Sequence, residues 1–457
     1  MQKREHWGSR MGFILAASGS AVGIGNIWKY PSIAGQNGGA AFTLVYLACI
    51  LVVGLSIVIA EFVIGRNTQL SPVGAFEKLA PNTSWKWVGF LGVGSAFAIL
   101  SFYGVVGGWI FKYIIMSLTG GFDTLAGSPD TAGNVFNTFI TGLWAPVFYQ
   151  VIFMTVCIWV IIHGVKGGIE KWSKIMMPLI IILLAVLAVR GMTLPGGSEG
   201  LAFLFNPRFE ELTASGIVLA LGHAFFTLSL GMGTMITYGS YLGKKENLLN
   251  SALWVIFLDT AIAMLAGVAI FTTVFALGAN PAEGPGLIFV VLPSVFPQLA
   301  GGTVWGTMFF ILLFMAALTS AISILEVVTA YFIDQKGWSR KKATIRFGAV
   351  ITVVGAFCSF SLGGGINITG IFGISFFDFM DGLSSKYMLP IGGMFTAIFI
   401  LKKWGIPNFI NELKNGMDHF NVPPALIRTL LTIGAAVVAF IIFNEIYAVF
   451  AGKALIG

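Results

Sequence analysis

The chain has 457 residues, of which 57% are hydrophobic and only 10% charged, and its formal net charge is +7. Soluble domains keep about a quarter of their residues charged, so this composition excludes a water-soluble fold and predicts an integral membrane protein. The four histidines form no HExxH-like pair and the three cysteines lie in apolar stretches, so neither residue type predicts a metal centre or a disulfide framework.

Long apolar stretches follow one another along the whole chain. A helix of about twenty apolar residues crosses a bilayer. Eleven stretches meet this length and predict an all-α polytopic membrane protein: 11–33, 40–65, 87–118, 143–163, 171–191, 215–241, 251–278, 302–333, 345–362, 371–401 and 425–450. The stretch 279–301 is apolar but rich in proline and glycine, so we expect a hairpin-like lid on the outer face there instead of a span.

Basic residues are unevenly divided between the connections. With a cytoplasmic N-terminus, the inner segments hold 20 of the 26 basic residues, whereas the outer loop 119–142 holds Asp123 and Asp130 and no base. Because cytoplasmic loops are enriched in Lys and Arg, this predicts a cytoplasmic N-terminus and an extracellular C-terminus. The positive charge is then a topology signal, and no basic soluble face is left for nucleic acid.

Two spans carry glycine clusters near their centres, Gly19–Asn26 in the first and Leu228–Gly233 in the sixth. Close helix packing explains either cluster alone. Their matched positions, five helices apart and beside polar residues, favour broken helices in an inverted repeat with a binding site at the breaks. We therefore expect a first five-helix repeat in 1–200, an inverted second repeat with the lid in 201–404, and an inner loop with an eleventh helix in 405–457.

The same residues carry a family resemblance. The segment 4–31, REHWGSRMGFILAASGSAVGIGNIWKYP, resembles the signature of the neurotransmitter:sodium symporter family. Further matches follow in the family order: NGGAAF at 37–42, AEFVIGR at 60–66, FFTLSLGMGTMITYGSY at 225–241, LTSAISILE at 318–326 and FDFMD at 377–381. The resemblance, closest to bacterial members with eleven helices, implies a LeuT-type 5+5 inverted repeat plus an eleventh helix. It also implies a sodium-coupled importer of neutral amino acids in the cell membrane, and not an enzyme.

The resemblance implies a substrate site at the two breaks. Its residues would be Ala21, Gly23, Ile24, Gly25, Ile99, Tyr103, Phe226, Thr227, Ser229, Met232, Ser320 and Ile324. Tyr103 would bond the substrate carboxylate and Phe226 would cover the substrate. From the residues alone, Tyr103 and the two isoleucines are equally typical of a buried core. An apolar wall containing Met predicts a neutral hydrophobic or aromatic side chain, and Gly23, where amine-transporting relatives carry an acid, favours amino acids.

Two sodium sites are implied by the same resemblance. One would use Ala21, Asn26, Thr227, Asp259 and the substrate carboxylate, and the other would use Gly19, Val22, Ala316, Thr319 and Ser320. Oxygen ligands suit a hard cation. For Thr319 and Ser320, back-bonding to the preceding helical turn is the alternative.

Asp259 departs from the bacterial model of the family that this chain resembles, which has Asn there. A carboxylate in mid-membrane is costly and marks a functional site. Chloride-binding relatives use Gln and Ser where this chain has His223 and Ala263. We therefore expect no chloride requirement, and proton counter-transport by Asp259 is a hypothesis.

Charged pairs and a proline motif are the candidates for moving parts. Lys29 and Asp381 match an outer gate, and Arg4 and Asp334 match an inner gate with Tyr241 as partner and Trp7 as plug. Glu61 resembles the acid that satisfies the sixth helix at its break. Gly168 and Pro178 match a Gly-X9-Pro motif for unwinding of the fifth helix. The alternatives are ordinary juxtamembrane charge and a static proline kink.

The implied partners are a neutral amino acid, sodium ions and the lipid bilayer, without nucleic acid. An amino-acid-sensing membrane receptor or a channel is the other function class. A channel needs a selectivity filter or a ring of charges, and the spans repeat no such motif. An enzyme needs a nucleophile–base or metal constellation, which the sequence does not offer.

Overall fold

The computed structural model describes residues 4–278, 286–363, 373–417 and 422–451, without the side chains of 448–450. Within these residues, nine helices are long and apolar enough to cross a membrane. They are Ala40–Thr68 (α3 and α4), Lys86–Leu118 (α6), Ala145–Ile162 (α8), Val165–Met192 (α9 and the turn before it), Leu248–Ala276 (α13), Gly302–Lys336 (α15), Arg340–Phe360 (α16), Phe376–Trp404 (α17 and α18) and Pro424–Tyr447 (most of α20). The multi-pass α-helical class predicted from composition is confirmed.

The first span is broken where the glycine cluster lies. Helix α1 runs over Arg10–Ala21, and its continuation Gly25–Gln36, which includes α2 (Tyr30–Gln36), is bent from it by 50°. The break is narrower than the predicted cluster, because helical bonding continues through Gly19 to Ala21. Only Val22 and Gly23 leave the helix.

The sixth span is broken as well. Helix α11 (Ala214–Thr227) and α12 (Thr234–Gly239) are separated by residues 228–233. Ser229, Gly231 and Gly233 lie there with φ of 53°, 77° and 76°, in the left-handed region that glycine adopts without strain. With the broken first span counted as one, ten of the eleven predicted spans are long and apolar enough to cross a membrane among the described residues. The sixth is not, because neither of its halves reaches that length.

A carboxylate supports the second break. The backbone N–H of Gly231 donates to Glu61 Oε1 of α4 over 2.7 Å. A Cβ on Gly231 would lie 2.0 Å from the carbonyl oxygen of Leu389 in α18 (Leu389–Phe399). Because an unpaired backbone group in the bilayer costs several kcal/mol, Glu61 replaces the helical bond that the break removes.

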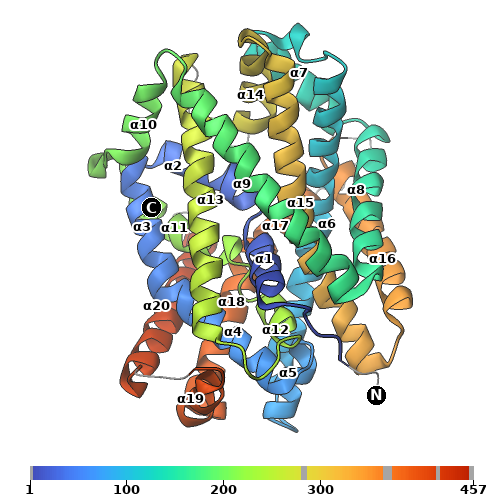
Figure 1. The fold of residues 1–457 in the computed structure, drawn as a ribbon, viewed down its shortest axis with the longest axis vertical. Helices are drawn as coiled ribbons and strands as arrows, with labels where there is room; N and C mark the ends of the chain where they lie inside the picture. Colours follow the sequence, from blue (N-terminus) through green and yellow to red (C-terminus); the bar gives the residue numbers. More distant parts are fainter. Residues whose placement is uncertain (1–3, 279–285, 364–372, 418–421, 452–457) are drawn as a thin grey trace.

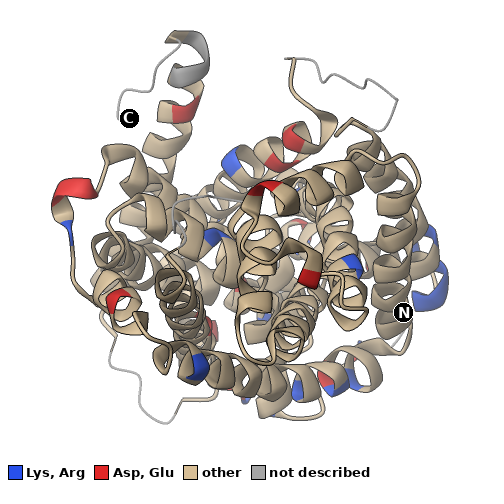
Figure 2. Ribbon diagram, turned by 90° about the horizontal axis from the view of Figure 1, so that it is seen from above, with Lys and Arg blue, Asp and Glu red and all other residues tan. Residues whose placement is uncertain are grey.

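The broken helices lie inside the bundle. Figure 1 shows α1 in the middle of the molecule, with α5 (Pro72–Leu79), α19 (Ile406–Lys414) and the N-terminus at one end. The opposite end carries α7 (Pro129–Ile140) and α14 (Leu292–Val295). Seen from above in Figure 2, charged residues form a small part of the ribbon, as an apolar bundle in lipid requires.

The described part of the predicted lid is a short helix and not a hairpin. It runs over Leu287–Gln298, and residues 279–285 lie outside the described residues. Phe289 is buried, and its ring lies 5.7 Å from that of Trp28 and 5.9 Å from that of Trp109. This short helix therefore lies toward the end of the bundle opposite the N-terminus, and it contacts Trp28, which follows the first break.

Near the N-terminal end, a buried arginine joins distant parts of the chain. Arg66, at the end of α4, is fully buried. Its Nε donates to Glu412 Oε1 of α19 over 2.7 Å, and its Nη1 donates to the carbonyls of Glu246 and Asn415 over 2.5 and 3.1 Å. One side chain thus ties the second span to the loop before α13 and to the segment before α20 (Pro424–Ala451).

Candidate functional site

A small cavity lies between the two helix breaks. Its empty volume is about 290 Å³. The residues that line it are Ser20, Ala21, Gly23, Gly25, Ile99, Tyr103, Phe226, Thr227, Ser229, Met232, Ser320 and Ile324. Eleven of the twelve residues predicted for the substrate site are among them. The twelfth, Ile24, reaches the site with its backbone N–H, which donates to the Tyr103 hydroxyl over 3.3 Å.

Hydroxyl groups that the sequence analysis did not single out lie beside this cavity. Ser20 Oγ lies 2.7 Å from Ser323 Oγ and 3.2 Å from Ser229 Oγ, and Ser229 Oγ also donates to the Ser20 carbonyl over 2.9 Å. Ser323 follows Ser320 by one helical turn, so spacing on α15 was the signal that could have found it. Ser20 lies inside the glycine cluster itself.

One end of the cavity is suited to a carboxylate. A Cβ on Gly23 would lie 2.6 Å from Ser320 Oγ and 2.9 Å from the Tyr103 hydroxyl, so only a glycine lets these two hydroxyls approach the backbone this closely. Backbone N–H groups at the start of a helix attract anions, and the second half of the first span starts at Gly25.

Oxygen atoms of three helices meet beside the first break. Thr227 Oγ1 donates to Asp259 Oδ1 over 2.9 Å and lies 3.1 Å from Asn26 Oδ1. The Asn26 amide donates to Asp259 Oδ1 over 2.8 Å, and the Tyr46 hydroxyl lies 3.4 Å from Asp259 Oδ2. Asn26, Thr227 and Asp259 are all buried. The arrangement offers a negatively charged oxygen cluster next to the cavity, which fits a hard monovalent cation.

The second predicted oxygen cluster lies between the first break and α15. Ser320 Oγ reaches across to the carbonyls of Ser20, Val22 and Gly19, over 3.1, 3.4 and 3.5 Å. Thr319 Oγ1 bonds its own helix at Ala316 and Met315, over 3.0 and 3.1 Å, and lies 3.5 Å from the Val22 carbonyl. Back-bonding therefore applies to Thr319, while Ser320 bridges the two helices.

The acidic and imidazole groups do not suggest a transition-metal centre. In the part of the chain that the structure describes, no three His, Cys, Asp or Glu residues gather closely enough to hold a metal ion. The two oxygen clusters contain one carboxylate, that of Asp259. A site with one carboxylate and several neutral oxygens would bind a cation weakly enough to release it again.

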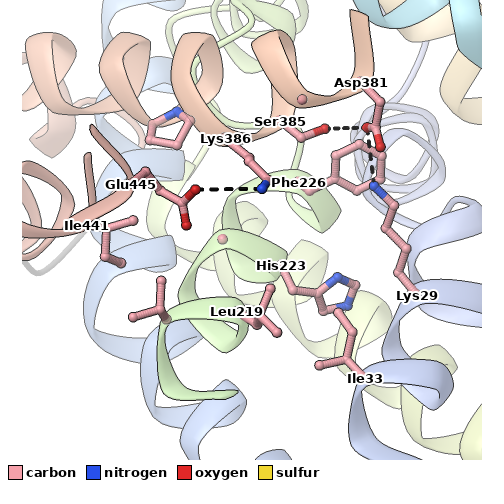
Figure 3. A pocket seen from close by; sticks show the side chains of 14 residues that line it. Lys29, Ile33, Leu219, His223, Phe226, Asp381, Ser385, Lys386, Ile441 and Glu445 are labelled. Atoms are coloured by element: carbon pink, nitrogen blue, oxygen red, sulfur yellow. Dashed lines mark hydrogen bonds and ion pairs between the residues drawn. The ribbon is translucent and has the colours of Figure 1, made fainter. Parts of the chain in front are cut away.

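A larger cavity adjoins the first, with the ring of Phe226 between them. Phe226 lines both, and the second cavity has an empty volume of about 790 Å³. Figure 3 shows Lys29 and Asp381 meeting beside this ring. Their Nζ and Oδ1 atoms are 3.5 Å apart, and the Lys29 ammonium lies 4.1 Å from the centre of the Phe226 ring. A paired cation therefore holds the aromatic partition in place.

Toward the N-terminal end, the predicted gate residues are also in contact. Arg4 Nη1 lies 2.5 Å from Asp334 Oδ1, and the Arg4 guanidinium lies 4.5 Å from the centre of the Tyr241 ring. Trp7 Nε1 donates to the Tyr238 carbonyl over 3.0 Å. A charged pair is thus formed toward each end of the bundle, Arg4 with Asp334 and Lys29 with Asp381.

Glu326 contacts a predicted inner-gate residue, Tyr241, and was not among the predicted site residues. Its Oε1 accepts from the Tyr241 hydroxyl over 2.5 Å, and its two oxygens bind Arg340 over 2.6 and 3.0 Å. The signal was present, because a carboxylate within an apolar span marks a functional position.

The fifth span is wound through its predicted hinge. Gly168 lies in the π-helical turn Val165–Glu170, and α9 (Lys171–Met192) continues through Pro178. A Cβ on Gly168 would lie 2.1 Å from the Val160 carbonyl oxygen, so this glycine permits close packing on α8. The unwinding implied by the resemblance is not present in this structure.

Comparisons with known proteins agree with this architecture. The profile of the sodium:neurotransmitter symporter family matches residues 4–126 and 142–454. An uncharacterized sodium-dependent transporter of Bacillus subtilis (strain 168), YhdH, is 40% identical over 417 residues, which are 91% of this chain and 92% of that protein. The uncharacterized sodium-dependent transporter MJ1319 of Methanocaldococcus jannaschii is 34% identical over 441 residues, 91% of this chain and 86% of that protein.

A solved structure has the same fold. MhsT, crystallised in complex with L-phenylalanine, is 47% identical, with a TM-score of 0.88. The match covers 96% of this chain and 99% of that one. The match confirms the predicted LeuT-type, all-α architecture. These relatives are transporters and not enzymes, in agreement with the prediction that the chain is not an enzyme. The chain is a sodium-dependent transporter that belongs to the sodium:neurotransmitter symporter family.

Proposed function

We propose that this protein is a symporter that imports neutral hydrophobic or aromatic amino acids, driven by two sodium ions, by alternating access. The observation that carries the proposal is the cavity between two helix breaks, with an oxygen cluster beside it at each break. The likeness to MhsT, whose structure holds L-phenylalanine, supports the substrate class.

The lining of the cavity favours a substrate that is charged at one end and apolar at the other. The hydroxyls of Ser320 and Tyr103 and the backbone N–H of Ile24 meet beside Gly23, and these groups would bind an amino-acid carboxylate. Ile99, Met232 and Ile324 form apolar wall on the side-chain end. A charged side chain would lack a counter-ion there, and its desolvation would cost several kcal/mol.

Sodium and substrate would be coupled because they share ligands. The cluster of Asn26, Thr227 and Asp259 borders the cavity through Thr227, which lines the cavity and also bonds Asp259. A substrate carboxylate placed near Gly23 would complete the ligand shell of the first ion. Each ligand then raises the affinity of the other by the same factor, as linkage requires.

Asp259 is the reason to propose transport without chloride. A fixed carboxylate supplies the negative charge that a chloride ion would otherwise bring to the sodium site. The neighbouring His223 ring packs against Tyr46, with ring centres 5.1 Å apart, and Ala263 has no polar side-chain atom to offer an anion. After sodium leaves, Asp259 would bind a proton and carry it outward.

The charge distribution supports a cytoplasmic N-terminus in the cell membrane. Arg4–Asp334 then forms the inner gate and Lys29–Asp381 the outer gate. Residues 1–200 and 201–404 would be the two inverted repeats, each with one broken helix.

Uptake into proteoliposomes tests the proposal. The buffers contain gluconate in place of chloride. An inward sodium gradient should then drive accumulation of labelled phenylalanine, leucine or tryptophan, and not of lysine or glutamate. A chloride requirement would overturn the chloride proposal. Sodium-dependent binding without accumulation would favour a receptor, and accumulation of charged amino acids alone would overturn the substrate class.

A further inference from the structure

The N-terminal segment and the start of the fifth span exchange carboxylates. Glu5 Oε2 accepts a hydrogen bond from the backbone N–H of Val165 over 2.6 Å. In the other direction, Glu170 Oε2 accepts from the N–H of Gly8 over 2.5 Å, and Glu170 Oε1 accepts from the Ser9 hydroxyl over 3.0 Å. We call these contacts between residues 5–9 and residues 165–170 the reciprocal latch.

Each carboxylate enters a space that a glycine leaves open. A Cβ on Gly164, which has φ of 82°, would lie 2.7 Å from Glu5 Oε2. On Gly12 in α1, the three atoms nearest to a Cβ all belong to Glu170, at 2.2 to 2.5 Å. The latch therefore depends on local shape as well as on charge.

The Glu170 half is the more deeply buried one. Its side chain is 2% exposed and pairs with Lys174 over 2.5 Å, whereas the Glu5 side chain is 41% exposed. Glu5 also accepts from Arg340 Nε over 2.7 Å, and Arg340 holds Glu326. The latch is thus connected to Tyr241 of the inner gate through Glu326.

The position of the latch joins two moving parts. Trp7, the predicted plug, lies between Glu5 and Gly8, so both latch contacts flank it. On the other side, Val165 and Glu170 begin and end the π-helical turn that contains Gly168. The plug cannot leave with residues 5–9 unless the bonds to this turn break, and the turn cannot unwind without losing the same bonds.

We propose that Glu170 is a positioning residue of the inner gate, which keeps the fifth span wound while the N-terminal segment is docked. This inference rests on the proposed alternating access. When residues 5–9 leave, Val165 loses Glu5 and Glu170 loses Gly8 and Ser9, so that Glu170 keeps only Lys174, and the segment from Gly168 to Pro178 is free to unwind. The inner gate and the helix hinge then open as one event.

Hydrogen exchange of the purified full-length protein, saturated with sodium, tests the latch. Glu170→Ala removes the carboxylate, and Gly12→Ala pushes it aside while leaving its charge in the chain. In both variants, amides 165–178 should exchange about tenfold faster than in the wild type, because exchange reports local opening. Glu77→Ala, which removes an exposed glutamate of α5, is the matched control and should leave this segment unchanged.

Three outcomes separate the possibilities. Unchanged exchange at 165–178 in both Glu170→Ala and Gly12→Ala overturns the latch, even if the wild type transports amino acids. Exchange that rises equally in α6 and in 165–178 also overturns it, because that result shows general destabilisation. The proposed function is tested independently of the latch. It is wrong if proteoliposomes with the wild-type protein do not accumulate a neutral amino acid under a sodium gradient.

Discussion

At the scale of single residues, Asp259 is the side chain whose charge distinguishes this site. Replacing it in Asp259→Asn keeps the size and an oxygen but removes the negative charge from the cluster with Asn26 and Thr227. We expect the apparent sodium affinity to fall about tenfold, which corresponds to about 1.4 kcal/mol. Sodium titrations of substrate binding measure this. Asp123→Asn, at an exposed position, is the control, and an unchanged titration in Asp259→Asn would remove Asp259 from the sodium site.

Gly23 lies where we propose that the substrate carboxylate binds. In Gly23→Ala, the new methyl group would lie 2.6 Å from Ser320 Oγ and 2.9 Å from the Tyr103 hydroxyl. Overpacking costs about 1–3 kcal/mol, so we expect substrate affinity to fall about ten- to a hundredfold. Equilibrium binding of labelled phenylalanine checks this. Gly243→Ala, where a Cβ meets nothing within 4 Å, should bind normally. Equal affinities for the two variants would place the carboxylate elsewhere.

At the scale of elements, Pro178 weakens the turn of α9 that would unwind if the Gly-X9-Pro motif acts as a hinge. Proline inside a helix removes a hydrogen bond and costs about 3 kcal/mol, so Pro178→Ala stabilises the wound form. We expect turnover to fall about tenfold while equilibrium binding of the substrate stays unchanged. Initial uptake rates beside binding curves separate the two effects. Pro146→Ala is the control, because Pro146 lies in the first turn of α8, where the missing N–H has no partner to lose. Wild-type turnover in Pro178→Ala would leave the proline as a static kink.

The helix breaks were the elements best predicted from sequence, and local bonding explains the remaining differences. Residues 228–233 leave the helix as predicted, because Gly231 and Gly233 accept positive φ and Glu61 replaces a lost bond. In the first span, helical bonding continues to Ala21, which glycine content alone does not reveal. Contacts between distant segments, such as Glu326 with Tyr241 or Glu5 with Val165, depend on tertiary packing. No regular spacing of residues in the sequence predicts them.

At the scale of the whole molecule, the uneven basic residues make topology testable. We expect a cysteine in Asp123→Cys to react with an impermeant maleimide on intact cells, and one in Lys341→Cys to react only after permeabilisation, since basic loops stay inside. Both positions are exposed. The parent chain supplies the background, because its three cysteines lie within spans. Labelling of Lys341→Cys on intact cells would reverse the proposed orientation.

The spans and the cluster of site residues could be read from sequence because lipid forces helices to be long and apolar, and because the resemblance fixes the order of the motifs. The simultaneous formation of both charged pairs could not be predicted from the sequence. Whether Arg4 meets Asp334 while Lys29 also meets Asp381 depends on a balance between packed arrangements that share one sequence.

Arg66 has a consequence for how this protein is made. Its guanidinium is fully buried, and the acceptors that satisfy it include Glu412 and Asn415, more than three hundred residues later in the chain. A buried charge left without its partner costs about 3–5 kcal/mol. We therefore expect the second helix to reach its native packing only after residues 406–415 have been synthesised, because Arg66 has no acceptor from them before then. In a chain that stops before them, the guanidinium would stay in water at the end of α4, and the contact between α4 and α19 could not form.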